Sequence, residues 1–405
     1  MLYRTIKKTG DKISTLGFGL MRLPQKFGRI NEKKSEYLVR YAVDSGLNYL
    51  DTAVPYHRGQ SEPFLGKLLE SGIREKVKIA TKLPFWAVDT NKELFTTLDK
   101  QLQKLKTDRV DYYLLHSLNK NAWEKLLRLN VLDFIEKSIK NGKIINIGFS
   151  YHGDKDTFKK IIDAYPWIFT QIQFNYLDTE YQAGIEGMYY AAKKDISVIC
   201  MEPLRGGSLA EKPVENIQKI WDESKNRWSP CEWSLRWILN HKEIVTILSG
   251  MNSLEQLKEN IKICSQQIDL SEEDIQRVNR VVKIHKSLNI IPCTKCNYCM
   301  PCPFGVEIPS CFDYFNNAST KKSSTAKYFY LLTLGGVLGK AGNTSLCTAC
   351  GKCVPKCPQE IDIPKQMKLV KKELEGKTFR LKIFIIKLVL KITKIVKKIK
   401  MILRS

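Results

Sequence analysis

Two short cysteine runs lie near the C-terminal end of the chain. They read Cys293-x2-Cys296-x2-Cys299-x2-Cys302-Pro303 and Cys347-x2-Cys350-x2-Cys353-x3-Cys357-Pro358. A cubane iron–sulfur cluster needs four thiolates, and a loop with cysteine at every third residue supplies three of them. In two-cluster ferredoxins, the cysteine before the proline ligates the other cluster. The spacing therefore predicts two [4Fe–4S] clusters and transfer of single electrons. Only two residues separate Cys299 from Cys302, where three are usual, so the sequence leaves open which of the two clusters Cys302 ligates.

Zinc and disulfides explain these cysteines less well. Zinc ligands usually come in pairs rather than in consecutive triplets. Residues 1–10 are polar and basic and do not resemble a signal sequence, so we expect a cytoplasmic protein with reduced thiols. Cys311 is close enough to the first run to be a spare ligand. The other three cysteines are interpreted as buried or incidental thiols: Cys200, Cys231 and Cys264.

The chain before about residue 290 has a different pattern, in which short apolar runs alternate with amphipathic stretches. The runs predicted as buried strands are 15–20, 47–51, 77–81, 112–115, 144–149, 169–174, 197–201 and 245–248. The stretches predicted as helices include 35–45, 92–104, 130–141 and 154–163. Eight such units over roughly 250 residues are typical of a (β/α)8 TIM barrel, and we predict one over residues 1–282. A doubly wound sheet would need a G-x-G-x-x-G fingerprint, which Gly17 and Gly19 do not form.

Four chemically capable side chains follow successive predicted strands. In a TIM barrel the catalytic groups lie at the C-terminal ends of the strands. Asp51 ends the second strand and Tyr56 follows it, Lys82 ends the third, and His116 ends the fourth. Each residue alone has a structural explanation, such as a helix cap or a core histidine. Together, an acid, a phenol, an amine and an imidazole at one mouth predict an active site.

These residues resemble the catalytic tetrad of the aldo/keto reductases. The similarity covers about residues 1–280, and it rests on these segments: 51–56, 61–62, 82, 116, 147–150, 170–175, 201–207, 249–252 and 259–260. The cysteine-rich region, which we place at 283–370, is similar to the dicluster ferredoxin-like domain found on a microbial branch of the same family. Its Cys302-Pro303-Phe304-Gly305-Val306 and Cys357-Pro358-Gln359 segments carry that resemblance.

The resemblance implies nicotinamide-dependent reduction of a small carbonyl substrate. Tyr56 would be the general acid. Its unperturbed pKa of about 10 would be lowered by the ammonium of Lys82, which Asp51 would hold in place. His116 would hydrogen-bond the carbonyl oxygen. Further cofactor contacts are implied for Met21, Asp51, Ser150, Gln171, Met201, Pro203, Leu204, Gly206, Gly250, Gln256, Glu259 and Asn260.

The identity of the nicotinamide cofactor stays open between NADP(H) and NAD(H). Gly250 and Gln256 fall where NADPH-preferring members carry Lys and Arg, and a glutamine cannot pair bidentately with a 2′-phosphate. Met201 falls where the family often has a tyrosine that stacks on the nicotinamide, and a thioether can also pack against a ring.

The end of the chain is strongly basic. The net charge is +24, and residues 365–405 contribute fourteen basic and two acidic residues. The spacing within 371–405 predicts a basic amphipathic helix, with Lys387, Lys391, Lys394 and Lys398 opposite an apolar face. Residues 378–405 are therefore predicted to bind the anionic surface at the inner face of the membrane. The alternative is that they pack on the barrel or on a second subunit. Nucleic acid is not expected, because no binding module accompanies the charge.

Two functions of different classes stay open. The chain is either a nicotinamide-dependent reductase whose clusters exchange electrons with a redox partner, or an electron-transfer or scaffold protein with a catalytically inert barrel. The intact set of Asp51, Tyr56, Lys82 and His116 favours the enzyme. Hydride carries two electrons and a cluster carries one, and the sequence contains no flavin motif that would bridge them.

Overall fold

The chain folds into two compact units. The computed structural model describes residues 1–288, 290–321, 324–337 and 339–389. Residues 1–213 and 218–282 form the first unit, and residues 214–217 belong with the second unit, which begins at Lys283.

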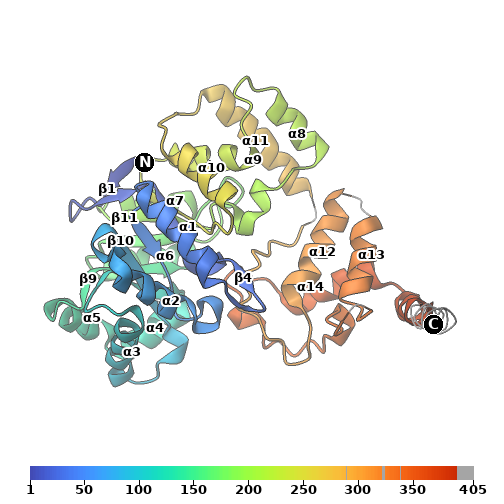
Figure 1. Ribbon diagram of the computed structural model, residues 1–405, viewed down its shortest axis with the longest axis horizontal. Helices are drawn as coiled ribbons and strands as arrows, with labels where there is room; N and C mark the ends of the chain where they lie inside the picture. Colours follow the sequence, from blue (N-terminus) through green and yellow to red (C-terminus); the bar gives the residue numbers. More distant parts are fainter. Residues whose placement is uncertain (289, 322–323, 338, 390–405) are drawn as a thin grey trace, which may run out of the picture. The chain divides into compact units, whose positions relative to one another are not determined.

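The first unit is a closed barrel of eight parallel strands (Figure 1). They are β3 (Leu16–Gly19), β6 (Tyr49–Asp51), β7 (Lys78–Leu83), β8 (Val110–Leu118), β9 (Ile144–Tyr151), β10 (Phe169–Gln173), β11 (Ser197–Met201) and β12 (Ile244–Ser249). Each strand pairs with the next along the chain, and β12 closes the barrel by pairing Ile247 with Leu16. The predicted (β/α)8 TIM barrel is confirmed. Two short hairpins complete the strands: β1 (Tyr3–Thr5) with β2 (Lys12–Ser14), and β4 (Gln25–Lys26) with β5 (Arg29–Ile30).

Helices lie between the strands of the barrel and after its last strand. They are α1 (Glu32–Asp44), α2 (Ser61–Leu68), α3 (Asn91–Leu105), α4 (Lys120–Arg128), α5 (Val131–Lys140), α6 (Lys155–Ala164), α7 (Gly184–Ala192), α8 (Glu215–Asp222), α9 (Pro230–Leu239), α10 (Leu254–Cys264) and α11 (Glu272–Ser287). Their starts follow from side-chain caps. Thr90 and Glu93 form a reciprocal capping box at α3, and the Ser229 side chain caps α9, which has Pro230 in its first turn.

Two of the expected strand ends are wrong by one or two residues. β7 continues past Lys82 to Leu83, and β8 continues past His116 to Leu118. In β8 the register with β9 shifts between Leu115 and Leu118, and Ser117 has a left-handed φ of 52°. Such a bulge interrupts the alternation of a strand and redirects the side chains beside it, so the sequence pattern alone ended the strand too early.

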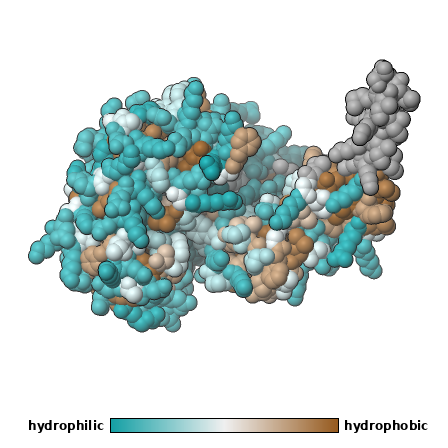
Figure 2. Space-filling model, turned by 60° about the horizontal axis from the view of Figure 1, so that its bottom comes forward, coloured by the Kyte–Doolittle hydropathy of each residue, from teal (hydrophilic) through white to brown (hydrophobic). Residues whose placement is uncertain are grey.

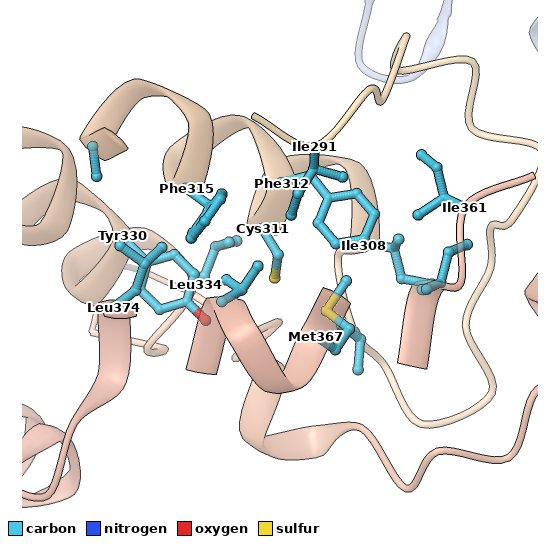
Figure 3. Close-up of a cluster of buried hydrophobic side chains, with 14 of the residues drawn as sticks. Ile291, Ile308, Cys311, Phe312, Phe315, Tyr330, Leu334, Ile361, Met367 and Leu374 are labelled. Atoms are coloured by element: carbon cyan, nitrogen blue, oxygen red, sulfur yellow. The ribbon is translucent and has the colours of Figure 1, made fainter. Parts of the chain in front are cut away.

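The second unit is a small helical domain around its own apolar core (Figure 3). Its helices are α12 (Ile308–Lys321), α13 (Ser324–Thr333) and α14 (Ile363–Val370). The segment 321–342, between the two cysteine runs, contains α13. Cys311 is fully buried in this core, and its Sγ lies 3.5 Å from the carbonyl oxygen of Gly342. This thiol therefore belongs to the packing of the domain.

A buried carboxylate fixes the segment before the second cysteine run. Glu375 accepts hydrogen bonds from the hydroxyls of Tyr330, at 2.7 Å, and Thr344, at 2.5 Å. It also accepts from the backbone amide and the hydroxyl of Ser345. These donors satisfy the oxygens of a buried carboxylate, which would be costly to bury without hydrogen bonds. These contacts tie the residues after α14 to the loop that leads into Cys347.

Candidate active site and cluster sites

The barrel mouth brings Asp51, Lys82 and Tyr56 into direct contact. The ammonium of Lys82 donates to both carboxylate oxygens of Asp51, at 2.6 and 2.7 Å, and to the carbonyl oxygen of Thr52 at 2.9 Å. The same ammonium lies 3.3 Å from the hydroxyl of Tyr56. The Lys82 and Asp51 side chains are only 1% and 3% exposed. Lys82 therefore links an acid that orients it to a phenol that it can polarise.

Burial and pairing act in opposite directions on this ion pair. Burial lowers the pKa of Lys82, while the Asp51 carboxylate raises it. Burial raises the pKa of Asp51, and Lys82 lowers it. With two short hydrogen bonds between them, the pair is most stable with both groups charged. A charged ammonium beside Tyr56 favours the phenolate form of that residue.

Tyr56 is delivered to the pair by a strained turn after β6. It begins the 3-10 segment η2 (Tyr56–Gly59), in which His57 and Arg58 have left-handed φ values of 51° and 56°. The ring of His57 holds this turn, because its Nε2 accepts from the amide of Leu23 at 3.1 Å. Non-glycine residues in this region are uncommon and cluster at functional sites.

His116 forms the other side of the site. Its ring lies 6.4 Å from that of Tyr56, nearly perpendicular, and 5.1 Å from the half-exposed ring of Trp86. Burial, the charge of Lys82 and the neighbouring His152 hold the pKa of His116 well below its usual range. His116 is therefore a neutral imidazole at pH 7, suited to hydrogen-bonding an oxygen rather than to carrying charge.

His152 is a second imidazole at the mouth that the sequence reasoning missed. It follows β9, and its Nδ1 lies 3.1 Å from the amide oxygen of Gln182, which itself has a left-handed φ of 57°. Because that oxygen can only accept, Nδ1 carries the proton and Nε2 is left as an acceptor. Burial lowers the pKa of His152 to about 4. The signal in the sequence that could have identified His152 was its position two residues after Ser150, an expected cofactor contact.

The expected nicotinamide contacts lie on neighbouring strands. Ser150 accepts from the amide of Ser117 at 2.7 Å, and the amide nitrogen of Gln171 lies 3.5 Å from the sulfur of Met201. Among the described residues, the Oε1 of Gln171 is buried without a hydrogen-bond partner. An orphan buried acceptor is costly unless a ligand donates to it, and a carboxamide N–H₂ is such a donor. The residues here fit a nicotinamide.

The remaining expected contacts divide into two groups. In the first group, Met21 lies in η1 (Leu20–Arg22) directly after β3. Pro203, Leu204 and Gly206 follow β11, and Gly250 follows β12, so these residues lie at the C-terminal ends of strands. Gln256, Glu259 and Asn260 lie on α10, where each already has a partner within the chain. Their partners are the Asn252 amide at 2.9 Å, the Ser229 hydroxyl at 2.6 Å and the Ser249 hydroxyl at 2.7 Å, respectively.

The eight cysteines of the two runs fall into two crossed groups. One group, formed by Cys293, Cys296, Cys299 and Cys357, lines a hollow in the second unit. Burial and the nearby thiols of Cys347, Cys302 and Cys350 raise the pKa of Cys353, which places these four cysteines close together. Each group thus takes three thiols from one run and the pre-proline cysteine of the other, which is the arrangement that the sequence left open. No group of three or more His, Cys, Asp or Glu within the described ranges is placed to hold a single metal ion.

Sequence comparison agrees with both units. Residues 15–283 match the Aldo/keto reductase family, and residues 292–362 match the 4Fe-4S dicluster domain. The chain belongs to the aldo/keto reductase family.

Relatives of this aldo/keto reductase share the barrel. L-galactose dehydrogenase of Arabidopsis thaliana is 26% identical over 307 residues, which are 70% of this chain and 95% of that protein. The uncharacterized oxidoreductase YqkF of Bacillus subtilis is 26% identical over 311 residues, 68% of this chain and 96% of that protein. An aldo-keto reductase from Klebsiella pneumoniae, solved in complex with NADPH, is 20% identical with a TM-score of 0.59, covers 70% of this chain and 96% of its own, and shows the shared fold.

Proposed function

We propose that this aldo/keto reductase reduces a small carbonyl compound with a nicotinamide cofactor, NADP(H) or NAD(H). The observation that carries the proposal is the buried ammonium of Lys82, which contacts both the Asp51 carboxylate and the Tyr56 hydroxyl. This constellation prepares a phenol to give up its proton at neutral pH. The orphan Oε1 of Gln171 and the NADPH complex of the Klebsiella relative support the cofactor.

The roles of the side chains follow from their surroundings. When bound, the nicotinamide supplies hydride to the carbonyl carbon. The oxygen gains negative charge, and Tyr56 gives it a proton, while Lys82 stabilises the phenolate that remains. Neutral His116 hydrogen-bonds the same oxygen and orients it, and Trp86 beside His116 helps to exclude water from that side. Asp51 keeps Lys82 charged and in place.

The test is the substitution Tyr56→Phe. We expect carbonyl reduction to fall by about 10² or more, in line with loss of a general acid, with cofactor affinity unchanged. Tyr113→Phe is the matched control, because it also removes a buried phenol hydroxyl, which here donates to Gln101 at 2.7 Å. A Tyr56→Phe protein that reduces a panel of aldehydes as fast as the wild type would show that the assignment of Tyr56 as the general acid is wrong. A wild-type protein that neither binds a nicotinamide nor reduces any carbonyl would favour the inert-barrel alternative.

We further propose that the crossed cysteine groups hold two [4Fe–4S] clusters, which would supply one-electron transfer to or from a redox partner protein. The two groups differ in exposure. The first is lined by the apolar side chains of Ile308, Phe312 and Ile361, whereas Cys350 of the second is exposed. The second cluster is therefore the better placed to exchange electrons with a partner.

A third part of the proposal concerns the C-terminal helix. Residues 379–389 are helical, and their large apolar side chains Leu381, Phe384, Ile385, Leu388 and Val389 are 46–65% exposed. Ile383 and Ile386 pack on the core of the second unit. In Figure 2, apolar residues gather on the visible face of the second unit, whereas the visible face of the barrel is mostly hydrophilic.

Of the expected lysine face, only Lys387 lies within the described residues. At 100° per residue, the exposed apolar residues form one stripe, and Lys382 and Lys387 fall on its two sides. An apolar stripe with basic edges fits the boundary of an anionic membrane. None of the described helices is long and apolar enough to span a membrane. We propose that the cytoplasmic protein binds the inner membrane face peripherally. Lys391, Lys394 and Lys398 lie outside the described residues.

A further inference from the structure

The loop after β11 is held in an unusual conformation. Glu202 and Arg205 have left-handed φ values of 54° and 48°, and Gly206 and Gly207 follow with 69° and 98°. For a glutamate or an arginine this conformation costs about 1 kcal/mol or more. The loop keeps this shape because its polar groups are bonded internally. Such strain, at the C-terminal end of a barrel strand, points to a function of the loop itself.

Glu202 makes the central contacts of this loop. Its Oε2 accepts from the backbone amide of Gly206 at 2.6 Å, and its Oε1 lies 3.8 Å from the guanidinium of Arg22. The side chain is only 17% exposed, and its backbone carbonyl accepts from the Asn175 amide at 3.1 Å. A half-buried carboxylate thus accepts from a backbone N–H and lies beside a guanidinium.

Arg22 connects this loop to a third one. A Cβ added to Gly250 would lie 3.0 Å from Cδ of Arg22, so the arginine side chain lies flat against this glycine at the end of β12. Arg22 therefore contacts the loop after β12 and the carboxylate of the loop after β11. These loops are the ones from which Leu204, Gly206 and Gly250 are proposed to contact the cofactor.

A backbone N–H in a glycine turn together with an arginine is a set of groups that binds phosphate. Here both groups already face an anion that belongs to the chain. We propose that Glu202 is an internal substitute for phosphate, which occupies the pyrophosphate subsite of the cofactor and must be displaced when a dinucleotide binds. The inference rests on the proposed nicotinamide function and deepens it, because it makes Glu202 a residue that weakens binding and speeds cofactor release.

The test compares Glu202→Gln with the wild-type holoprotein. The amide is isosteric and can still accept from Gly206, so the loop keeps its shape while the negative charge is lost. The probes are NADPH, NADH and reduced nicotinamide riboside, which carries no phosphate, and binding is followed by the fluorescence of the reduced nicotinamide. Asp274→Asn is the matched control, because it also neutralises a buried carboxylate paired with an arginine, Arg277 at 3.0 Å.

We expect Glu202→Gln to bind both dinucleotides about tenfold more tightly, since the charged carboxylate no longer competes with the cofactor phosphates for the Gly206 amide and Arg22. The affinity for the riboside should not change, and Asp274→Asn should match the wild type. Equal or weaker dinucleotide binding by Glu202→Gln overturns the inference, as does an equal gain for the riboside. If neither protein binds any of the three probes, the proposed nicotinamide function itself fails.

Discussion

The Asp51–Lys82 ion pair allows stability and chemistry to be separated. Lys82→Met, Asp51→Leu and the double variant each replace a buried charged group with an apolar one of similar size. Removing one partner leaves the other charge buried at an exposure of 1% or 3%. Breaking a buried pair in this way costs about 3–5 kcal/mol, so each single variant should lose about that much stability.

The double variant should recover most of this loss. Replacing a whole buried pair with apolar residues is often neutral or stabilising. The carbonyl oxygen of Thr52, which accepts from Lys82 at 2.9 Å, then loses its donor. An unsatisfied buried acceptor costs about 1–3 kcal/mol. We therefore expect the free energy of unfolding of the double variant to lie within about 3 kcal/mol of the wild-type value. All three variants should lose carbonyl reduction, because Tyr56 loses its ammonium in the two variants without Lys82, and Asp51→Leu removes the carboxylate that keeps Lys82 charged and in place.

Tryptophan fluorescence is the suitable assay. All seven tryptophans lie between Trp86 and Trp237 and hence in the first unit, so unfolding in urea monitored by their emission reports on the barrel and not on the cluster domain. The reasoning is refuted if the single variants are as stable as the wild type, or if the losses in the double variant add. Undiminished carbonyl reduction by the double variant would refute the catalytic role of the pair.

Three other perturbations have definite expected outcomes. Burial lowers the pKa of His152 to about 4 in the folded state, so on acidification the unfolded chain binds this proton first, and the stability due to the burial of His152 is present above pH ~6.5 and is lost as the pH falls toward about 4. His152→Gln should therefore make the urea midpoint depend less on pH over this window, and an unchanged pH dependence of the midpoint would contradict the assignment. Cys357→Ser should remove the cluster of the first run, read from iron content and electron paramagnetic resonance, whereas loss of the second cluster would show uncrossed ligation. Deletion of 378–405 should abolish salt-sensitive sedimentation with anionic vesicles, and equal sedimentation of the truncated protein would exclude membrane binding.

Much of the barrel was predictable because its signals are local. Buried parallel strands are short β-branched or aromatic runs, and the order of strands and helices fixes a (β/α)8 topology. The bulge in β8 was not predictable, because it depends on Ser117, whose amide donates to Ser150 on the neighbouring strand. That bond forms only after the two strands have paired, so no pattern within β8 indicates it.

The candidate site likewise contains residues that the local sequence pattern indicates and residues that only long-range contacts reveal. Asp51, Tyr56, Lys82 and His116 could be selected from the sequence because each lies at or near the C-terminal end of a strand and has a side chain capable of chemistry. The residues around them were missed. His57, His152 and Glu202 contact residues distant in sequence, namely Leu23, Gln182 and Arg22. Ring nitrogens and carboxylates in loops have many ordinary explanations, so the sequence did not single these residues out. Such contacts become visible only when the loops are assembled in space.

The crossed grouping of the cysteines is a further case. The spacing of each run predicts three ligands from one loop, but the fourth ligand depends on how the runs approach each other. The packing of Ile308, Phe312 and Ile361 around the first group brings Cys357 beside Cys293, Cys296 and Cys299. The unusual spacing before Cys302 therefore does not prevent Cys302 from lying near Cys347, Cys350 and Cys353.

The most direct test of the proposed chemistry is the fate of the transferred hydrogen. The anaerobic holoprotein is given an aldehyde and a reduced nicotinamide deuterated at the ring carbon that carries the hydride, and the alcohol is analysed by mass spectrometry. Hydride transfer at a site organised by Tyr56 and Lys82 predicts one deuterium on the former carbonyl carbon, and about 10²-fold slower labelling with Tyr56→Phe. Alcohol without deuterium, formed at the same rate by both proteins, would contradict this mechanism.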